Sequence, residues 1–143
     1  MERESLLTGI LVINKPKSLT SRDVVNHVSK LLHTKKIGHT GTLDPIATGV
    51  LILTIGKCTK LSEFLTSKFK EYEATFVLGS ETDTLDNTGV VLKTSDIAVD
   101  DETITSCIKS FEGSYDQTVP AYSAVKIAGR RLYDYARNGE EVE

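Results

Sequence analysis

The residues best suited to chemistry lie in one loop, between positions 37 and 50 of this 143-residue chain. The loop contains one histidine, His39, and one aspartate, Asp44, among glycines and threonines that allow close approach by a ligand. Because Asp44 precedes Pro45, its backbone is confined to extended geometry, which projects the carboxyl group in a defined direction. A carboxylate can act as a base or as a nucleophile. Taken alone, an Asp-Pro pair is more often only a turn, which leaves this loop as a candidate site.

Other patterns that could bind phosphate or a metal fail on spacing. Gly56–Cys58 resembles the end of a phosphate-binding loop, but Leu51 stands where a glycine is required. The acidic residues of the segment 83–89 are three apart, which does not match a calcium loop. The histidines at 27, 33 and 39 recur every six residues, so they do not share a helix face and are a poor zinc site. We therefore expect no metal.

The elements that must hold this loop are predicted by hydrophobic periodicity. Residues 9–14 and 50–55 are short apolar runs rich in β-branched residues, which indicates two buried strands. Between them, Thr20 and Asp23 have the spacing of a capping box. A helix should follow, with one buried stripe made of Val24, Val25, Val28, Leu31 and Leu32. Residues 34–49 lack either periodicity and are expected to be irregular.

The remainder of the chain predicts further short elements. A short helix should carry Leu61, Phe64 and Leu65, and residues 70–78 alternate as a strand does, with Tyr72, Ala74, Phe76 and Leu78 on one face. A strand at 89–93, a helix with Ile104, Cys107, Ile108 and Phe111 on its apolar side, a strand at 122–127 and a last helix at 132–138 ending at Gly139 complete the prediction. Cys107 is expected in the core. We predict an α/β (α+β) fold with one domain over residues 1–143 and no internal boundary.

Composition excludes several classes of protein. With 39% hydrophobic and 26% charged residues, the chain is that of a globular protein rather than a disordered, collagenous or coiled-coil one. Its longest apolar run, 50–55, is far shorter than the roughly 20 residues that a membrane span needs, so we expect no membrane association. The two cysteines, Cys58 and Cys107, are typical of reduced thiols, and we expect a cytoplasmic location.

The net charge of −3 conceals an asymmetry that bears on the partner. Residues 1–70 contain eleven Lys and Arg against five Asp and Glu, a net charge of +6, whereas residues 71–143 carry −9. A basic half that also contains Asp44 can present a surface to the phosphates of a nucleic acid.

Five segments, in this order, resemble a known family. They are 12–16 (VINKP) with Thr20-Ser21, 38–51 (GHTGTLDPIATGVL), 70–74 (KEYEA), 82–86 (TDTLD) with Gly89, and 120–126 (PAYSAVK) running into 129–133. Together they resemble the bacterial tRNA pseudouridine-55 synthases, the TruB-type pseudouridine synthases, over about residues 9 to 142. The resemblance implies the pseudouridine-synthase catalytic fold, a mixed and largely antiparallel sheet flanked by helices.

The same resemblance implies roles for individual residues. Asp44 would be the essential catalytic aspartate, acting either by attack on ribose C1′ or by abstraction of a 2′ proton. Tyr72 would stack on the target uracil, and His39 would lie near the flipped nucleotide. Lys15 would face the RNA. The implied partner is the T stem-loop of tRNA, whose uridine at position 55 is isomerised without a cofactor, and the parent enzyme is expected to be a monomer.

The family pattern continues beyond Glu143, so we expect this catalytic domain to be truncated at its C-terminus. The expected continuation includes further core strands, an arginine that pairs with the catalytic aspartate, and often an RNA-binding domain. Two alternatives stay open. The chain could be an RNA-binding fragment without catalytic activity, or a small hydrolase that uses His39 and Asp44 together.

Overall fold

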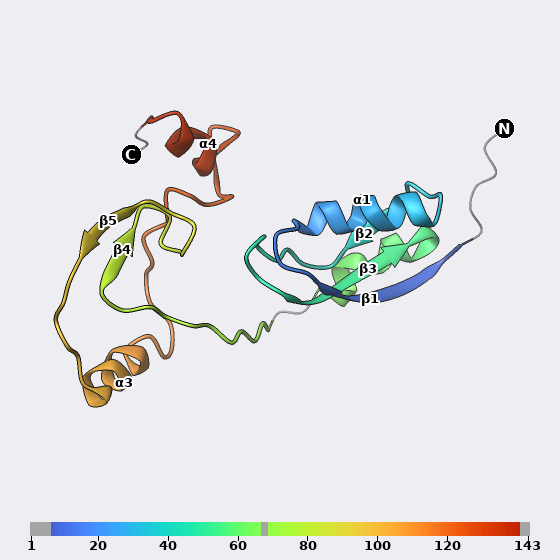
Figure 1. The fold of residues 1–143 in the computed structure, drawn as a ribbon. Coiled ribbons are helices and arrows are strands. Elements are labelled where there is room, and N and C mark those ends of the chain that lie inside the picture. The colour runs from blue at the N-terminus through green and yellow to red at the C-terminus, as the bar shows by residue number, and fades with distance from the viewer. Residues whose placement is uncertain (1–6, 67–68, 141–143) are drawn as a thin grey trace. The chain divides into compact units, whose positions relative to one another are not determined.

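The computed structural model describes residues 7–66 and 69–140 and divides the chain into two compact units, Met1–Glu73 and Ala74–Glu143. The first unit contains β1 (Gly9–Lys15), α1 (Ser21–Leu31), β2 (Ile37–His39), β3 (Gly49–Ile55), the 3-10 helix η1 (Gly56–Leu61) and α2 (Ser62–Leu65) (Figure 1). The second contains β4 (Ser80–Thr82), β5 (Val91–Thr94), α3 (Asp101–Lys109), β6 (Lys126–Ile127), β7 (Arg130–Arg131) and α4 (Leu132–Arg137). The sequence pattern did not indicate this division, which falls inside the alternating segment 70–78.

The first unit is built on an antiparallel sheet in the order β1-β3-β2. β1 and β3 are the two strands predicted from the apolar runs, and they pair along their whole length, from Gly9 opposite Ile55 to Lys15 opposite Gly49. β2 lies in the segment that was expected to be irregular, and it pairs Ile37 with Ile55. A three-residue edge strand is too short to show a periodicity, so its pairing with β3 defines it.

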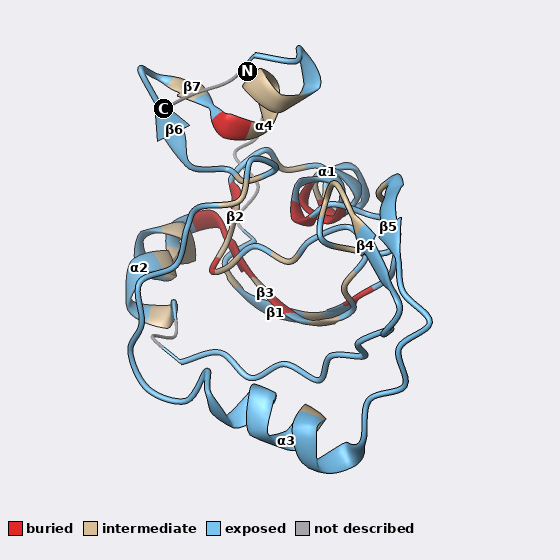
Figure 2. Ribbon diagram, turned by 90° about the vertical axis from the view of Figure 1, so that its left-hand side faces the viewer, coloured by how far each residue is buried: buried red, intermediate tan, exposed pale blue. Residues whose placement is uncertain are grey.

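One helix covers one face of this sheet. α1 begins as predicted, with Thr20 as N-cap and a complete capping box to Asp23. Its buried side joins the sheet in a core made of Val24, Val25, Val28, Ile37, Leu51, Leu53 and Ile55. Buried residues accordingly concentrate in α1, β2 and β3 (Figure 2). Leu31, predicted to belong to the buried stripe, is 65% exposed because it lies in the last turn, beyond the edge of the core.

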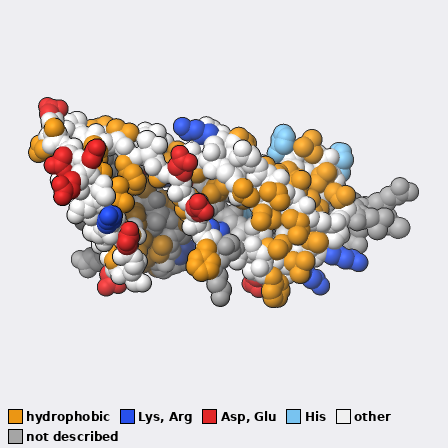
Figure 3. Space-filling view, turned by 90° about the horizontal axis from the view of Figure 1, so that it is seen from below, with side chains coloured by type: hydrophobic (Ala, Val, Ile, Leu, Met, Phe, Trp, Pro, Cys, Tyr) orange, Lys and Arg blue, Asp and Glu red, His pale blue; other side chains and the backbone are white. Residues whose placement is uncertain are grey.

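The opposite face of the sheet carries exposed apolar side chains. Ile10 and Val12 on β1 and Val50 on β3 are 50%, 62% and 70% exposed. On β3, Val50 precedes the core residue Leu51, and on β1, Val12 precedes Ile13, which packs against the core, so the side chains alternate as the pleat of a strand requires. Hydrophobic side chains gather over these strands when the molecule is seen from the side away from α1 (Figure 3).

The second unit consists of two two-stranded ribbons, β4-β5 and β6-β7, and two short helices. The predicted helices are present as α3, with Asp100 as N-cap, and α4. The predicted strand over 70–78 is wrong: these residues form no strand, and Phe76 and Leu78 are exposed, because an extended segment becomes a strand only where a neighbour receives its hydrogen bonds. Cys107 is also exposed rather than in the core, because α3 packs no buried residue.

Candidate functional site

Asp44 lies in the loop that joins β2 to β3, and its side chain is exposed. The loop leaves the sheet after Thr40, whose N–H donates to the Ile52 carbonyl at 3.0 Å and so extends the pairing of β2 with β3. At Asp44 the chain turns, because the Ala47 N–H donates to the Asp44 carbonyl at 3.1 Å. The carboxyl group that the sequence singled out therefore lies at the start of a tight turn, on the surface of the first unit.

Both neighbours of Asp44 are tied to the segment that leads into α1. The Leu43 N–H donates to Ser21 Oγ at 3.0 Å, and this hydroxyl lies 3.4 Å from the Leu43 carbonyl, to which it donates. On the other side, the Ser18 N–H donates to the Pro45 carbonyl at 2.7 Å. Asp44 is thus held between two anchored residues while its own side chain is left at the surface.

Lys15 lies beneath this arrangement, at the end of β1. Its side chain is fully buried, and Nζ donates to the carbonyl oxygens of Leu19 at 2.7 Å and Pro16 at 2.9 Å. A buried ammonium is stable only where acceptors replace its water, and these two carbonyls do so for Lys15. The structure therefore places Lys15 inside the turn 16–19, where it supports the segment that anchors Leu43 and Pro45. The sequence analysis expected Lys15 to face RNA instead.

His39 is the last residue of β2 and is partly buried. Its Nδ1 lies 2.6 Å from the Gly41 carbonyl. Because a carbonyl only accepts hydrogen bonds, Nδ1 carries a proton, which leaves Nε2 as the other ring nitrogen for a ligand. His39 thereby braces the first residues of the loop that contains Asp44.

Tyr72 lies in an irregular segment and is 65% exposed. The start of this segment approaches the Asp44 loop: Lys70 Nζ lies 3.1 Å from the point that a Cβ on Gly41 would occupy. His39 and Asp44 lie at the start and in the middle of one loop, and Lys15 bonds the turn 16–19, from which Ser18 binds Pro45. The role of Tyr72 beside Asp44 stays a prediction.

Sequence reasoning missed the two serines that anchor the loop. Ser21 is 2% exposed and bonds a residue 22 positions further along the chain. Ser18 adopts a positive φ of +72°, in a region that non-glycine residues seldom occupy. The segment Thr20-Ser21 was noticed in the family pattern, but the only role predicted from its residues was the helix cap of Thr20.

Local hydrogen bonds shift the pKa of charged side chains in both units. The Thr20 hydroxyl and backbone N–H donate to Asp23 at the start of α1, and this lowers the pKa of the Asp23 carboxyl below 3.8. In the second unit the hydrogen bonds of Glu140 lower the pKa of Glu140 and raise that of its partner Arg130. In each case the hydrogen bonds stabilise the charged form of the side chain. These charged groups therefore stabilise the local backbone around them.

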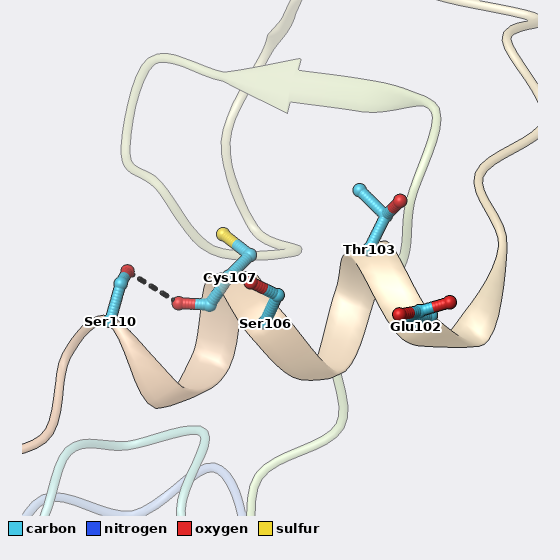
Figure 4. A pocket seen from close by; sticks show the side chains of 5 residues that line it. All are labelled: Glu102, Thr103, Ser106, Cys107 and Ser110. Carbon is cyan, nitrogen blue, oxygen red and sulfur yellow. Dashed lines mark hydrogen bonds between the residues drawn. The ribbon is translucent and has the colours of Figure 1, made fainter.

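Binding features elsewhere are few in the part of the chain that the structure describes. Residues 7–66 and 69–140 contain no group of three or more His, Cys, Asp or Glu side chains that could hold a metal ion. An open hollow runs along α3 and is lined by Glu102, Thr103, Ser106, Cys107 and Ser110 (Figure 4). It contains none of the predicted site residues. Neither cysteine forms a disulfide, and none of the described helices is of a length and apolarity that would cross a membrane.

The chain is similar to one family of proteins over most of its length. Residues 29–143 match the family model described as TruB family pseudouridylate synthase (N terminal domain). Among similar curated proteins, tRNA pseudouridine synthase B of Bacillus licheniformis is 47% identical over 140 residues, which cover 96% of this chain and 45% of the relative. The protein of the same name from Caldicellulosiruptor saccharolyticus is 50% identical over 137 residues, covering 96% and 47%. The chain spans about half the length of the curated relatives it matches.

Proposed function

We propose, because the chain belongs to the TruB family of pseudouridylate synthases, that it forms part of a tRNA pseudouridine synthase acting on the T-loop uridine at position 55. The observation that carries this proposal is the presentation of Asp44, whose two neighbours are anchored while its carboxyl group stays exposed. An exposed carboxyl group on a fixed backbone suits a macromolecular substrate that delivers one reacting nucleotide to the protein surface.

The isomerisation needs a group that acts at the ribose and then lets the base return. Asp44 would either attack C1′ and release uracil or remove a 2′ proton to give a glycal. In both routes the bond between N1 and C1′ breaks, the base rotates, and a bond forms between C5 and C1′. In the first route this displaces the Asp44 carboxylate from C1′, and in the second Asp44 returns the proton to C2′. The C5 proton is then lost and N1 gains one, so the product is an isomer of the substrate and no cofactor is consumed.

The other predicted residues would prepare the nucleotide. Tyr72 would stack on the uracil and take part in the transfer of the C5 proton. His39, fixed through Nδ1, would hold the opened loop of the flipped nucleotide with its other ring nitrogen. Lys15 would hold the turn 16–19 in place through its hydrogen bonds to the backbone. The net charge of +6 on residues 1–70 would attract the phosphates of the RNA.

The test is a pair of variants in the full-length protein. Asp44→Asn should abolish release of tritium from tRNA labelled at C5 of uridine, while tRNA binding persists. Asp96→Asn, which changes an exposed aspartate in the second unit, should release tritium at the wild-type rate. Near-normal release from the Asp44 variant would refute the proposal.

A second variant tests the base-stacking residue. Tyr72→Phe keeps the ring and removes the hydroxyl, so tRNA should still bind but turn over poorly. Turnover at the wild-type rate would remove Tyr72 from proton transfer and leave it only a stacking role.

One alternative gains support from the length of the match. Because the family model that matches is that of the N-terminal domain, residues 1–143 alone could bind RNA without modifying it. Incubation of this chain with a T stem-loop RNA, followed by chemical labelling of pseudouridine, separates the two outcomes: binding without product supports the RNA-binding alternative for this chain. The hydrolase alternative gains no such support, because the hydrogen bond described for the His39 ring is to the Gly41 carbonyl and not to the Asp44 carboxylate.

A further inference from the structure

We propose that Ser21 is the positioning residue of the Asp44 turn, a role that rests on the proposed function of Asp44. Its hydroxyl accepts from the Leu43 N–H at 3.0 Å and donates to the Leu43 carbonyl at 3.4 Å, so one side chain occupies both polar groups of the residue before Asp44. The Ser18 N–H holds the carbonyl of the residue after it. With the chain fixed on both sides, the direction of the Cα–Cβ bond of Asp44 is set, and with it the side of the loop on which the carboxyl group lies.

The hydroxyl of Ser21 has no part in capping its own helix. The N-cap of α1 is Thr20, whose Oγ1 accepts from the Asp23 N–H at 3.0 Å, and the Asp23 carboxylate completes the capping box. Ser21 is the first residue of the helix, where side chains of many kinds are tolerated. The two contacts of its hydroxyl are therefore made to the loop that contains Asp44.

Ser21 is itself held firmly. It is 2% exposed, and the next turn of its helix contributes Val24 and Val25 to the core. The turn before it is braced by the buried Nζ of Lys15, which bonds the carbonyls of Pro16 and Leu19. Ser21 thus connects the residue before an exposed aspartate to the helix that packs into the core of the first unit.

The chain offers a matched set of variants for a test in the full-length protein. Ser21→Ala removes both hydrogen bonds to Leu43. Ser21→Cys keeps the size of the side chain but offers a much poorer donor and acceptor, so it separates hydrogen bonding from packing. Thr20→Ala is the control, because it weakens the same helix start without touching Leu43.

We expect the rate of the chemical step in single-turnover tritium release to fall about ten- to a hundredfold in both Ser21 variants, since a small misplacement of a reacting group has that effect. The dissociation constant for tRNA should change less than about threefold, because the contacts of the RNA with the basic surface are kept. The Thr20 variant should keep the wild-type rate. Exchange of the Leu43 amide hydrogen should accelerate more in the Ser21 variants than in the Thr20 variant, in which loss of the cap raises exchange throughout the first unit.

Three results would overturn the role of Ser21. They are an equal loss of rate in the Thr20 variant, a loss confined to tRNA affinity, and a Leu43 amide that exchanges at the wild-type rate in both Ser21 variants. If the wild-type protein releases no tritium from tRNA, the proposed function fails. The exchange of Leu43 then decides separately whether Ser21 holds the Asp44 turn.

Discussion

The two units of this chain use similar local elements with very different results. In Met1–Glu73 a three-stranded sheet and one helix bury seven apolar side chains in a common core. In Ala74–Glu143 two ribbons and two helices form, and Asp100 caps α3, yet the only apolar residue of that unit among the buried core residues described is Leu132. Local sequence patterns are therefore sufficient to form a helix or a strand, but they are not sufficient to bury it in a core.

The difference bears directly on the site. Asp44 belongs to the unit with the core, and the residues that hold it are themselves anchored in that core or in the turn beside it. The α3 hollow belongs to the other unit and is lined by one helix alone. Precise placement of a reacting group needs supports from several segments, and the first unit provides them for Asp44.

The largest expected effect compares one apolar side chain from each unit, a buried one and an exposed one. Leu53 has no exposed surface, so Leu53→Ala should lower the free energy of unfolding by about 3 kcal/mol. Ile108 on α3 is 57% exposed, and Ile108→Ala should change it by less than about 0.5 kcal/mol. Urea unfolding followed by far-UV circular dichroism measures both. Equal losses would show that the second unit has a core of comparable strength.

The next largest effect is expected from alanine substitution of two glycines with positive φ, one in each unit. A Cβ on Gly56 would collide with the Leu7 carbonyl and the Thr8 hydroxyl, whereas a Cβ on Gly113 would meet nothing within 4 Å. Both Ala variants pay for a positive φ, but Gly56→Ala should cost about 2 kcal/mol more because neighbouring backbone must also move. Thermal unfolding of the two variants measures the difference, and equal melting temperatures would argue against tight packing at the end of β3.

Removal of the N-cap side chain of α1 or of α3 should lower the stability of that helix by about 1 kcal/mol. The loss should spread through the first unit but stay local in the second. Thr20→Ala should lower the stability of the whole first unit, because α1 forms part of its core. Asp100→Ala should only fray α3, which has no buried residues. Amide exchange measured residue by residue distinguishes the two: protection lost throughout β3 in the Asp100 variant would contradict the comparison.

The smallest expected effect is a local response to acid. Hydrogen bonds from Thr88 and Thr84 lower the pKa of Asp86 below 3.8, so their contribution to stability is complete above that value and is lost as pH falls through the lower pKa of the folded state. We expect the NMR signal of the Thr88 amide to titrate with a midpoint below the pKa of an ordinary aspartate, and to show no such step in Asp86→Asn. A midpoint at or above the ordinary value would contradict the assignment.

Local order was largely predictable from the sequence. The runs at 9–14 and 50–55 became β1 and β3, the Thr20–Asp23 spacing became a capping box, and the last two helices formed where their apolar patterns placed them. Each of these features depends on residues a few positions apart. The family could be recognised for the same reason, since its motifs are short and continuous.

Features that depend on distant partners were not predictable. The alternating residues of 70–78 have the pattern of a strand but no strand in the described chain to pair with, and Cys107 has the position of a core residue on a helix without a core. β2 is a strand because it pairs with β3, and the strand propensity of its own three residues does not decide this.

The position of Asp44 in a constrained loop between a helix and a buried strand could be predicted from the sequence, because proline and periodicity act locally. The contacts that hold that loop could not be predicted in this way. The bond from Leu43 to Ser21 spans 22 positions, and the burial of Lys15 depends on how the turn 16–19 closes over it. Such contacts form only when the packing of α1 on the sheet brings the two segments together, and no pattern within either segment encodes that distance.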